Sequence, residues 1–407
     1  MKATKIKTAD TEALAPRAAL AGGPLPSMAD YLPRLVARLG FPADPRRRHL
    51  MLAHLFDDTM RMLSALEPMV GWDAIIGVPY SSNRPGVAAR WSARFGDRVL
   101  IPRDLGALEG VLVDQLARSL AECRRNGQTL IVQEVGGFVA PLLHRYFADQ
   151  AHLVQGVVEI TKQGVWRARD LPLAFPVLHC ADSELKRLEA QRCGETVARC
   201  LDGAARSMGL SLAGREALVI GAGWIGAGVA RGLARLDMAP RLVDRDPLKV
   251  MEARLNGLPA DLAPRDPGRA ALVVGATGAA SIGPDLMAAL PDGAILASAS
   301  SRQIEIDVAW LRDHPSAHVA EGVEAFALRD GRRLMLVNDG FPANFLPGSG
   351  SVADEIVETI LGELIVLMRD LSARDFPPGV HRIAPEQEAL CAALWLELRD
   401  ANLRSPA

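Results

Sequence analysis

The chain has 407 residues, of which 49% are hydrophobic and 23% are charged, and its formal net charge at pH 7 is −2. This length allows two domains with separate cores, and the balanced charge gives no reason to expect nucleic acid or an anionic membrane as a partner. The five cysteines are scattered and form no CxxC pair, so they indicate neither a metal site nor a disulfide framework, and a reducing cytoplasm is the expected location.

The N-terminal part predicts a layer of alternating strands and helices. Residues 1–25 lack a continuous apolar core and predict a disordered tail rather than a signal peptide. Residues 28–39 and 48–66 have the apolar spacing of amphipathic helices. Short apolar runs, separated by helical patterns, follow at 72–78, 98–101, 129–132 and 154–159. Such alternation is typical of a parallel α/β sheet.

The most specific pattern of the chain is a glycine-rich turn between a strand and a helix. The apolar run 217–220 meets Gly221-Ala-Gly223-Trp-Ile-Gly226, a helical pattern follows, and the next short strand ends at Asp244. The first glycine permits the tight turn, the second lets the backbone approach a pyrophosphate, and the third lets the helix lie close to the sheet. This order of elements is the fingerprint of a dinucleotide-binding unit.

The turn therefore predicts a dinucleotide cofactor, with a glycine turn kept only for packing as the alternative. The helix begins at Trp224 and Ile225, where its free N–H groups can meet phosphates, although Trp224 could also serve packing alone. The carboxylate of Asp244 can accept both hydroxyls of the adenosine ribose and would repel a 2′-phosphate, so NAD is expected rather than NADP. Arg245 leaves an alternative, because it could meet that phosphate or merely cover the adenine face.

The later part of the chain continues the nucleotide sheet and ends in a long apolar helix. Residues 184–208 predict a helix that links the two units, and further strands are expected at 271–274, 294–298 and 333–338. Thr277 follows the first of these strands, at the end where such sheets place their ligands. Residues 351–354 have the spacing of a capping box before the helix 352–368, whose acidic residues argue against a membrane span.

Several stretches beyond the glycine turn carry a resemblance to a known family. They are residues 305–311 (Glu-Ile-Asp-Val-Ala-Trp-Leu), residues 330–333 followed by Gly340, and residues 376–381 (Phe-Pro-Pro-Gly-Val-His). Together with the fingerprint, they resemble the S-adenosylhomocysteine hydrolase family over nearly the whole chain, and the spacing between them is close to that of the family.

The resemblance implies an α/β fold in which a Rossmann-type doubly wound parallel sheet binds NAD. A second α/β domain, built from N-terminal and C-terminal segments, binds the substrate in that family. Residues 26–190 and 346–407 are therefore expected to form the substrate domain, and residues 191–345 the NAD-binding domain. Family members are usually tetramers, but this chain ends without the lysine/tyrosine tail of the family, so a homodimer or homotetramer is expected.

Part of the substrate site of the family is retained. The segment from His54 to Thr59 resembles the H-x-T-x-E-T motif, with an acid at Asp58 but with Phe56 in place of the first threonine. His54 is therefore expected to move a proton or position the substrate, and Asp58 and Thr59 to bind it; ordinary helix residues are the alternative. Lys186 falls on the lysine that assists substrate oxidation. Burial beside a nicotinamide would lower its pKa and allow it to act as a base.

The resemblance also extends to the cofactor side. Asn344 falls on an asparagine that contacts the nicotinamide side, Thr277 on a cofactor-contacting threonine, and Thr161 lies near the threonine run of the family. These three residues are therefore expected to bind NAD.

Several proton-transfer groups of the family are replaced. The residues that stand at these positions are Val135, Ile160, Ala190 and Ser301. Loss of one such group commonly costs about 10²–10⁴ in rate, so efficient hydrolysis of S-adenosylhomocysteine is not expected. The neighbouring Arg302 could bind a carboxylate or phosphate, or could merely end a polar strand.

Three hypotheses follow from these patterns. The first is an NAD-dependent oxidoreductase that permanently or transiently oxidises an alcohol or amine on a small molecule other than S-adenosylhomocysteine, in a setting such as specialised metabolism. Lys186 would be its base and His54 its second proton-transfer group. The second is a non-catalytic NAD-binding regulator or scaffold, and the third is a true hydrolase with substitute residues.

Overall fold

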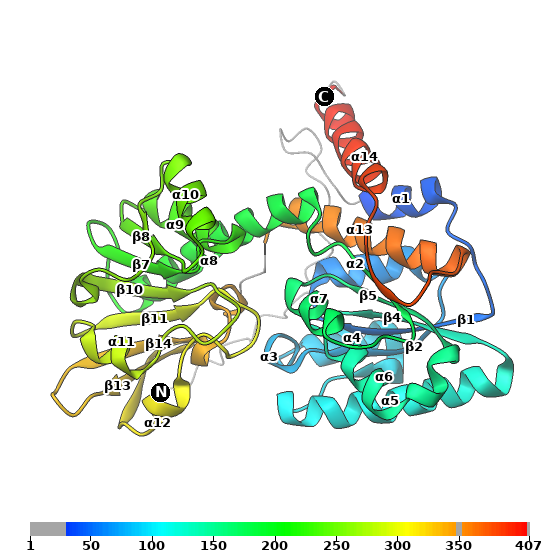
Figure 1. Cartoon of the computed structure of the whole chain (residues 1–407), viewed down its shortest axis with the longest axis horizontal. Helices are drawn as coiled ribbons and strands as arrows, with labels where there is room; N and C mark the ends of the chain where they lie inside the picture. Colours follow the sequence, from blue (N-terminus) through cyan, green and yellow to red (C-terminus); the bar gives the residue numbers. More distant parts are fainter. Residues whose placement is uncertain (1–29, 347–351, 405–407) are drawn as a thin grey trace, which may run out of the picture.

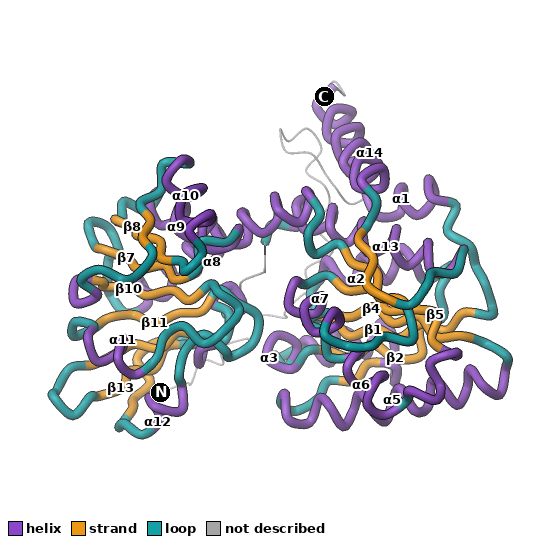
Figure 2. Tube along the Cα trace, viewed as in Figure 1, coloured by secondary structure: helices purple, strands orange, loops and turns teal. Residues whose placement is uncertain are grey.

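Two β-sheets, each with helices on both faces, form the two units of the molecule (Figure 1, Figure 2). This computed structural model describes residues 30–346 and 352–404, so the tail expected at residues 1–25 lies outside the described residues. The first unit contains segments from both ends of the chain, and the second unit lies between them in sequence. The long helix α8 (Glu184–Ser207) runs from one unit to the other in Figure 1.

The sheet of the first unit is parallel throughout, with the order β15-β6-β5-β4-β1-β2-β3. Its strands are β1 (Arg47–Ala53), β2 (Trp72–Gly77), β3 (Val99–Leu100), β4 (Thr129–Glu134), β5 (Val154–Glu159), β6 (Pro176–His179) and β15 (Gly379–Arg382). Its helices are α1 (Tyr31–Leu39), α2 (Asp57–Leu66), α3 (Pro79–Ser82), α4 (Val87–Phe95), η1 (Gly96–Arg98), α5 (Leu105–Asn126), α6 (Val139–Tyr146), η2 (Ala148–Leu153), α7 (Lys162–Arg169), α13 (Asp354–Ala373) and α14 (Pro385–Arg404). Because β15 pairs with β6, the end of the chain completes the sheet that its beginning starts.

The sheet of the second unit has the order β12-β13-β14-β11-β10-β7-β8-β9, with an antiparallel edge formed by β12, β13 and β14. Its strands are β7 (Glu216–Ile220), β8 (Ala239–Val243), β9 (Ala260–Asp261), β10 (Ala270–Gly275), β11 (Ala294–Ser298), β12 (Ser316–Ala320), β13 (Val323–Ala327) and β14 (Arg333–Val337). Its helices are α9 (Trp224–Ala234), α10 (Pro247–Leu255), η3 (Pro267–Arg269), α11 (Pro284–Ala289), α12 (Val308–Arg312), η4 (Asn338–Gly340) and η5 (Ala343–Phe345). The predicted fold class, a Rossmann-type doubly wound sheet with a second α/β unit, is confirmed.

In each sheet, the strand that comes first in the chain lies in the middle, and later strands are added on both sides of it. β1 lies between β2 and β4 in the first sheet, and β7 lies between β8 and β10 in the second. The connections therefore diverge at the carboxyl ends of β1 and β4, and again at the carboxyl ends of β7 and β10. Doubly wound sheets bind their ligands at such points.

The prediction of one helix over residues 48–66 is wrong in its first half. Residues 47–53 form the central strand β1, and a short loop separates this strand from α2. The segment has no β-branched residue, and leucine and methionine favour a helix by intrinsic propensity. Residues 50–52 are nevertheless 0% exposed between β2 and β4, so burial on both faces of a parallel sheet outweighs that propensity. β6, β12, β13 and β15 are further strands that no sequence pattern indicated.

α8 packs against α9 at a distance that only glycines allow. A Cβ atom on Gly194 would lie 2.2 Å from the carbonyl oxygen of Ile225 and 2.6 Å from the backbone nitrogen of Val229. A Cβ atom on Gly228 would lie 2.2 Å from the carbonyl oxygen of Gln191. Because all these neighbours are helix backbone atoms, they cannot rotate away. The two helices are therefore fixed against each other.

α13 belongs to the C-terminal segment and is buried on nearly all sides within the first unit. It packs against α1, α2 and the central strands, and its Glu363 accepts a hydrogen bond from the hydroxyl of Ser183 at 2.7 Å. The predicted capping box falls partly on Ser351, which lies outside the described residues; Ala353 is the N-cap and its side chain makes no capping bond. No helix in residues 30–346 and 352–404 is long and apolar enough to span a membrane.

We expect Gly194→Ala to lower the free energy of unfolding by about 1–3 kcal/mol, because the added methyl group must push two helix backbones apart. Gly203 is an exposed residue of the same helix with no atom within 4 Å of its Cβ position. Gly203→Ala should therefore raise the free energy of unfolding by about 0.5–1 kcal/mol through helix propensity. Urea denaturation followed by circular dichroism measures both changes. The same effect at both positions would contradict the close packing of α8 on α9.

Candidate functional site

The carboxyl ends of the two sheets face one another, and their loops are in contact. The ammonium group of Lys162 on α7 lies 3.3 Å from the ring centroid of Trp224 at the start of α9. The side-chain amide of Gln163 donates to the carbonyl oxygen of Gly278 at 3.2 Å. We call this region the junction; its loops comprise residues 54–56, 135–138 and 160–163 of the first unit and residues 221–226, 276–278 and 299–303 of the second.

The glycine turn has the geometry that a dinucleotide needs. Gly221 has a φ of 108°, which a side chain would strain. A Cβ atom on Gly226 would lie 1.8 Å from the carbonyl oxygen of Gly221, so only glycine lets α9 begin here. Gly223 has no protein atom within 4 Å of its Cβ position. α9 starts at Trp224 and Ile225 without a side-chain cap, so the first N–H groups of the helix suit a pyrophosphate.

Asp244 follows β8, and its carboxylate lies beside the glycine turn. One oxygen accepts the N–H of Ala222 at 2.8 Å and the other accepts the N–H of Asp246 at 3.0 Å. The ammonium group of Lys249 lies 3.6 Å away. This is the position from which an acid reaches the adenosine ribose in such folds, and the residues of the turn therefore fit NAD. Arg245 is exposed next to it.

Glu305 is a buried acid whose role the sequence did not reveal, and it organises the loops that follow β10 and β11. It is 0% exposed and accepts hydrogen bonds from the N–H and the hydroxyl of Thr277 at 2.6 and 2.8 Å. The N–H of Gly278 and the hydroxyls of Ser281 and Ser300 also donate to it. Glu305 opens one of the stretches that carry the family resemblance, so a signal existed, but its partners are distant in sequence.

Two further buried acids end neighbouring strands on the other side of the junction. Glu134 ends β4 and accepts the N–H groups of residues 138–140 at 2.7, 2.8 and 3.2 Å. Glu159 ends β5 and accepts those of residues 136–137 at 3.2 and 2.8 Å and that of Thr161 at 2.6 Å. Burial raises the pKa of both carboxyls, and the nearby Glu134 contributes to a pKa of about 8 for Glu159. Thr161 is the N-cap of α7.

Lys186 lies near the start of α8 and forms an ion pair with Glu189, whose carboxylate is 2.6 Å from the ammonium group. Burial acts to lower the pKa of Lys186, but the charge and hydrogen bond of Glu189 outweigh it, and the pKa is raised. The expectation of a lowered pKa is therefore wrong. Glu189 is 6% exposed and supplies the acid that Ala190 lacks. Because Glu189 follows Lys186 by three residues on one helix, this ion pair could have been predicted from the sequence.

Cys193 lies one turn further along α8, and Asn344 contacts it from η5. The side-chain amide of Asn344 donates to the sulfur of Cys193 at 3.5 Å. Burial raises the pKa of Cys193 to about 12, so the thiol is neutral near pH 7. Asn344 lies in η5 and is 3% exposed. The structure thus brings together Lys186 and Asn344, which the sequence analysis had placed on one site from separate motifs.

His54 lies in the loop after β1, not on a helix as predicted. Its Nδ1 is 2.6 Å from the hydroxyl of Ser81, which donates to the carbonyl oxygen of Val78 at 3.1 Å. Because the hydroxyl has one proton, it accepts from Nδ1–H, and the lone pair of the ring is then on Nε2. Burial, together with the charges of Arg84 and Lys186, lowers the pKa of His54 to about 3. The ring is therefore neutral near pH 7.

Aromatic rings from both units surround His54. Its ring centroid lies 4.9 Å from that of Phe345, 5.6 Å from that of Tyr80 and 6.0 Å from that of Phe56. Phe341 stacks on Tyr80 at 5.1 Å. Since Phe341 and Phe345 follow the last strand of the second sheet, these rings form an apolar contact between the units.

Asp58 and Thr59 lie in the first turn of α2, and each is 7% exposed. The hydroxyl of Thr59 donates to the carboxylate of Asp58 at 3.0 Å. Burial raises the pKa of Asp58, and the charge of Asp354 at the start of α13 adds to the effect. A role of this pair in substrate binding stays a prediction.

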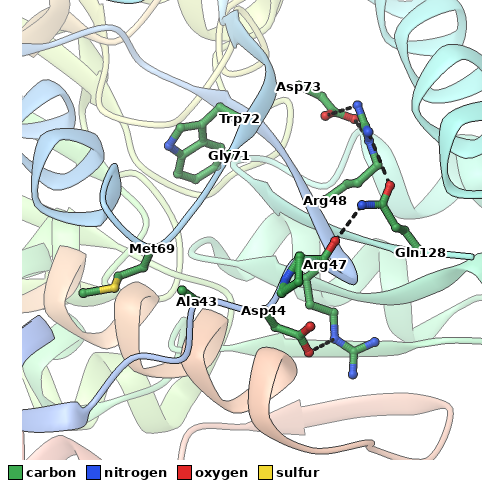
Figure 3. A pocket seen from close by; sticks show the side chains of 10 residues that line it. Ala43, Asp44, Arg47, Arg48, Met69, Gly71, Trp72, Asp73 and Gln128 are labelled. Atoms are coloured by element: carbon green, nitrogen blue, oxygen red, sulfur yellow. Dashed lines mark hydrogen bonds and ion pairs between the residues drawn. The ribbon is translucent and has the colours of Figure 1, made fainter. Parts of the chain in front are cut away.

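Two surface cavities lie at the amino ends of the strands, one on each sheet, away from the junction. One, of about 460 Å³, is at the amino ends of β1, β2 and β4, where Trp72 and Gln128 line it (Figure 3). Its charged residues pair with one another, as Arg48 does with Asp73 at 2.6 Å. The other, of about 450 Å³, is at the amino ends of β7, β8 and β10. Because parallel sheets bind ligands at their carboxyl ends, the junction is the candidate site. Among the described residues, no group of three or more His, Cys, Asp or Glu could hold a metal ion.

Residues 194–349 match the family model of the S-adenosyl-L-homocysteine hydrolase NAD-binding domain. The matched segment begins on α8 and includes the glycine turn, Asp244, Thr277 and Asn344. The second unit is therefore an NAD-binding domain.

Three related proteins match more than half of the length of this chain. The S-inosyl-L-homocysteine hydrolase of Methanopyrus kandleri is 30% identical over 279 residues, which cover 66% of this chain and 65% of that protein. The adenosylhomocysteinase of Aeropyrum pernix is 28% identical over 283 residues, covering 68% of each. The adenosylhomocysteinase of Pyrococcus abyssi is 32% identical over 248 residues, covering 55% of this chain and 54% of that protein. The chain thus spans about two thirds of the length of the first two relatives and about half of the third.

Among solved structures, an NADPH-dependent glyoxylate/hydroxypyruvate reductase from Sinorhizobium meliloti aligns with 83% of this chain and 100% of its own. The sequence identity is 13% and the TM-score is 0.45. A likeness at this level says nothing about function.

We expect Gly223→Ala to fold like the wild type but to bind NAD at least ~10-fold more weakly, because its methyl group meets no protein atom yet occupies the approach to the pyrophosphate. Gly226→Ala is the matched comparison and should also lower the melting temperature, since its methyl group collides with the carbonyl of Gly221. Calorimetric titration of NAD into the apo-protein and thermal unfolding measure the two effects. Unchanged NAD affinity in Gly223→Ala would show that the cofactor does not lie on this turn.

Proposed function

The chain belongs to the S-adenosylhomocysteine hydrolase family, and on that premise we propose that it is an NAD-dependent enzyme that oxidises, permanently or transiently, a hydroxyl or amine of a small molecule other than S-adenosylhomocysteine. When bound, NAD supplies the hydride acceptor that this oxidation needs. The observation that supports the proposal most is the group formed by Lys186, Glu189, Cys193 and Asn344 at the junction. Lys186, Glu189 and Cys193 lie on α8, the helix that packs on α9, and Asn344 lies in η5.

Lys186 acts in this proposal as a charged hydrogen-bond donor to the substrate atom that is oxidised. A cation at that place stabilises the negative charge that develops on an oxygen as it loses its proton. Glu189 keeps the lysine charged, because the ion pair raises the pKa of Lys186. His54 then accepts the proton at Nε2. Its pKa of about 3 keeps the ring neutral near pH 7 but makes it a weak base, so the transfer depends on the charge of Lys186 to lower the pKa of the substrate hydroxyl.

A second candidate function is that of an NAD-binding regulator or scaffold without catalysis. It is favoured by Val135 and Ile160, aliphatic residues at positions where the family carries acids, and by the ring of Phe345 packed against His54. It predicts NAD binding without reduction of the cofactor by any component of a cell extract.

Hydrolysis of an S-nucleosylhomocysteine is a third candidate, suggested by the names of the relatives. Glu134 and Glu159 are the acids closest to the replaced positions, but backbone N–H groups already occupy both carboxylates. Release of adenosine or inosine from the corresponding S-nucleosylhomocysteine, measured by chromatography, tests this candidate directly.

Four expectations from the sequence accompany the proposal. We infer a substrate domain formed by residues 26–190 and 346–407 around an NAD-binding domain of residues 191–345, which the pairing of β15 with β6 supports. A homodimer or homotetramer and a cytoplasmic location stay predictions. So does a setting in specialised metabolism.

We expect Lys186→Ala to lower kcat by about 10²–10⁴ in an assay that follows NADH absorbance with candidate alcohols and amines, because the charged donor to the substrate is removed. Arg187→Ala is the control, since this neighbouring side chain pairs with Glu184 on the exposed side of α8. Unchanged turnover in Lys186→Ala would eliminate the role of the lysine. If NAD binds but no candidate substrate or cell extract reduces it, the result favours the regulator.

Glu189→Gln should move the high-pH limb of the kcat profile to lower pH. Without the carboxylate, burial is the largest influence on Lys186 and lowers its pKa, so the lysine loses its proton and its activity at a lower pH than in the wild type. The pH dependence of kcat with a saturating substrate measures this change. A limb that stays in place would show that another group controls it.

A further inference from the structure

Two arginines meet at the junction and share one hydrogen-bond acceptor. Arg302 follows β11 in the second unit, and Arg167 lies on α7 in the first. Both guanidinium groups donate to the carbonyl oxygen of Gly136, at 2.8 and 3.2 Å. Arg167 also donates to the carbonyl oxygen of Gly137 at 3.4 Å. Two positive charges from different units are thus held at one uncharged oxygen.

No acidic side chain of the described residues lies within 4.0 Å of either guanidinium group. Arg48, another partly buried arginine, has such a partner in Asp73 at 2.6 Å. The Nε of Arg302 is buried and has no hydrogen-bond partner among the described residues. Burial, followed by the charge of Arg167, lowers the pKa of Arg302 to about 10, and burial also lowers the pKa of Arg167. The arrangement is therefore costly unless something negative compensates it.

The two buried acids behind the same loop provide only part of that compensation, because their charges act to raise the pKa of both arginines but burial outweighs them. Glu134 and Glu159 accept backbone N–H groups and neither contacts an arginine. Burial raises the pKa of both acids. The pair thus carries less than its full negative charge near neutral pH, and the buried Nε of Arg302 has no hydrogen-bond partner among the described residues.

The side chain of Arg302 is held in a defined direction. Its backbone has a φ of 72°, in the left-handed region that is uncommon for a residue with a side chain and that concentrates at functional sites. Its guanidinium group lies 3.8 Å from the ring centroid of Phe138. Stacking on an aromatic ring orients the planar fork of N–H donors. A solvated surface arginine has no such restraint.

We propose that Arg302 and Arg167 bind an anionic group of the substrate, a carboxylate or a phosphate, at the junction. The fork of N–H donors on arginine matches the oxygens of both groups, and a charged acceptor binds more strongly than the carbonyl of Gly136. Because each arginine belongs to a different unit, the anion also links the units across the bound substrate. The inference rests on the proposed function, since it assigns a negative charge to the substrate of that site.

The experiment titrates the full chain with NAD bound, at low ionic strength, with two probes: malonate for a carboxylate and inorganic phosphate for a phosphate group. Malonamide, the uncharged analogue of malonate, is the ligand control. Calorimetry gives the dissociation constants for the wild type, Arg302→Gln, Arg302→Lys and Arg167→Gln. Arg169→Gln is the matched control variant, because Arg169 is exposed on the same helix as Arg167 and lies 3.8 Å from Asp182.

The wild type and Arg169→Gln should bind at least one probe and not malonamide, and the tighter probe identifies the anion class. Each glutamine substitution should weaken that binding by about 10–100-fold. Arg302→Lys should recover part of it, since lysine keeps the charge but not the fork. Absence of binding in the wild type, or equal affinity in both glutamine variants, would overturn the inference. Melting temperature and NAD content are measured for each variant; if one glutamine variant does not fold, the other and Arg302→Lys decide.

The outcomes for this inference and for the proposed function are separable. Anion binding requires no turnover, so a protein that binds the probe through both arginines but never reduces NAD retains the anion site and loses the redox function. NADH formation from an uncharged substrate, unchanged in Arg302→Gln and Arg167→Gln, retains the redox function and overturns the anion site.

Discussion

The contact between α8 and α9 is the constraint on which the geometry of the site depends. Gly194 and Gly228 allow two helix backbones to approach so closely that neither can shift independently. α8 is a continuous helix of 24 residues, so the contact near its middle also fixes its first turns, where Lys186 lies. This close contact thereby determines where Lys186 and Glu189 lie relative to the glycine turn.

The charges at the junction are distributed in an uneven way. The acids Glu134, Glu159 and Glu305 accept hydrogen bonds from backbone N–H groups and, for Glu305, from hydroxyls, and none of them forms a direct ion pair with Arg167 or Arg302. Arg167 and Arg302 contact only carbonyl oxygens among their hydrogen-bond partners in the described residues. A partly buried charge without a counter-charge costs free energy, and an anionic ligand removes that cost on binding.

The two sides of the junction follow the family to different degrees. The NAD-binding side keeps the glycine turn and the acid at Asp244, and both have the geometry that the cofactor needs. The other side has aliphatic residues at Val135 and Ile160, and Glu189, which precedes Ala190, forms the ion pair with Lys186. A retained cofactor turn with a changed facing surface is what new substrate chemistry on an old fold requires, because the cofactor carries the redox step and the facing side chains select the substrate.

The NAD-binding unit could be predicted from the amino-acid order alone, because its glycine turn is a local pattern whose residues act within a few positions of one another. The ion pair of Lys186 with Glu189 is equally local and was readable from helix spacing. The central strand formed by residues 47–53 could not be predicted from the local pattern, since burial between two neighbouring strands outweighs helix propensity there. The same holds for the meeting of Arg167 with Arg302. Their contact depends on how two separate sheets face each other, and that information is absent from the local pattern around either residue.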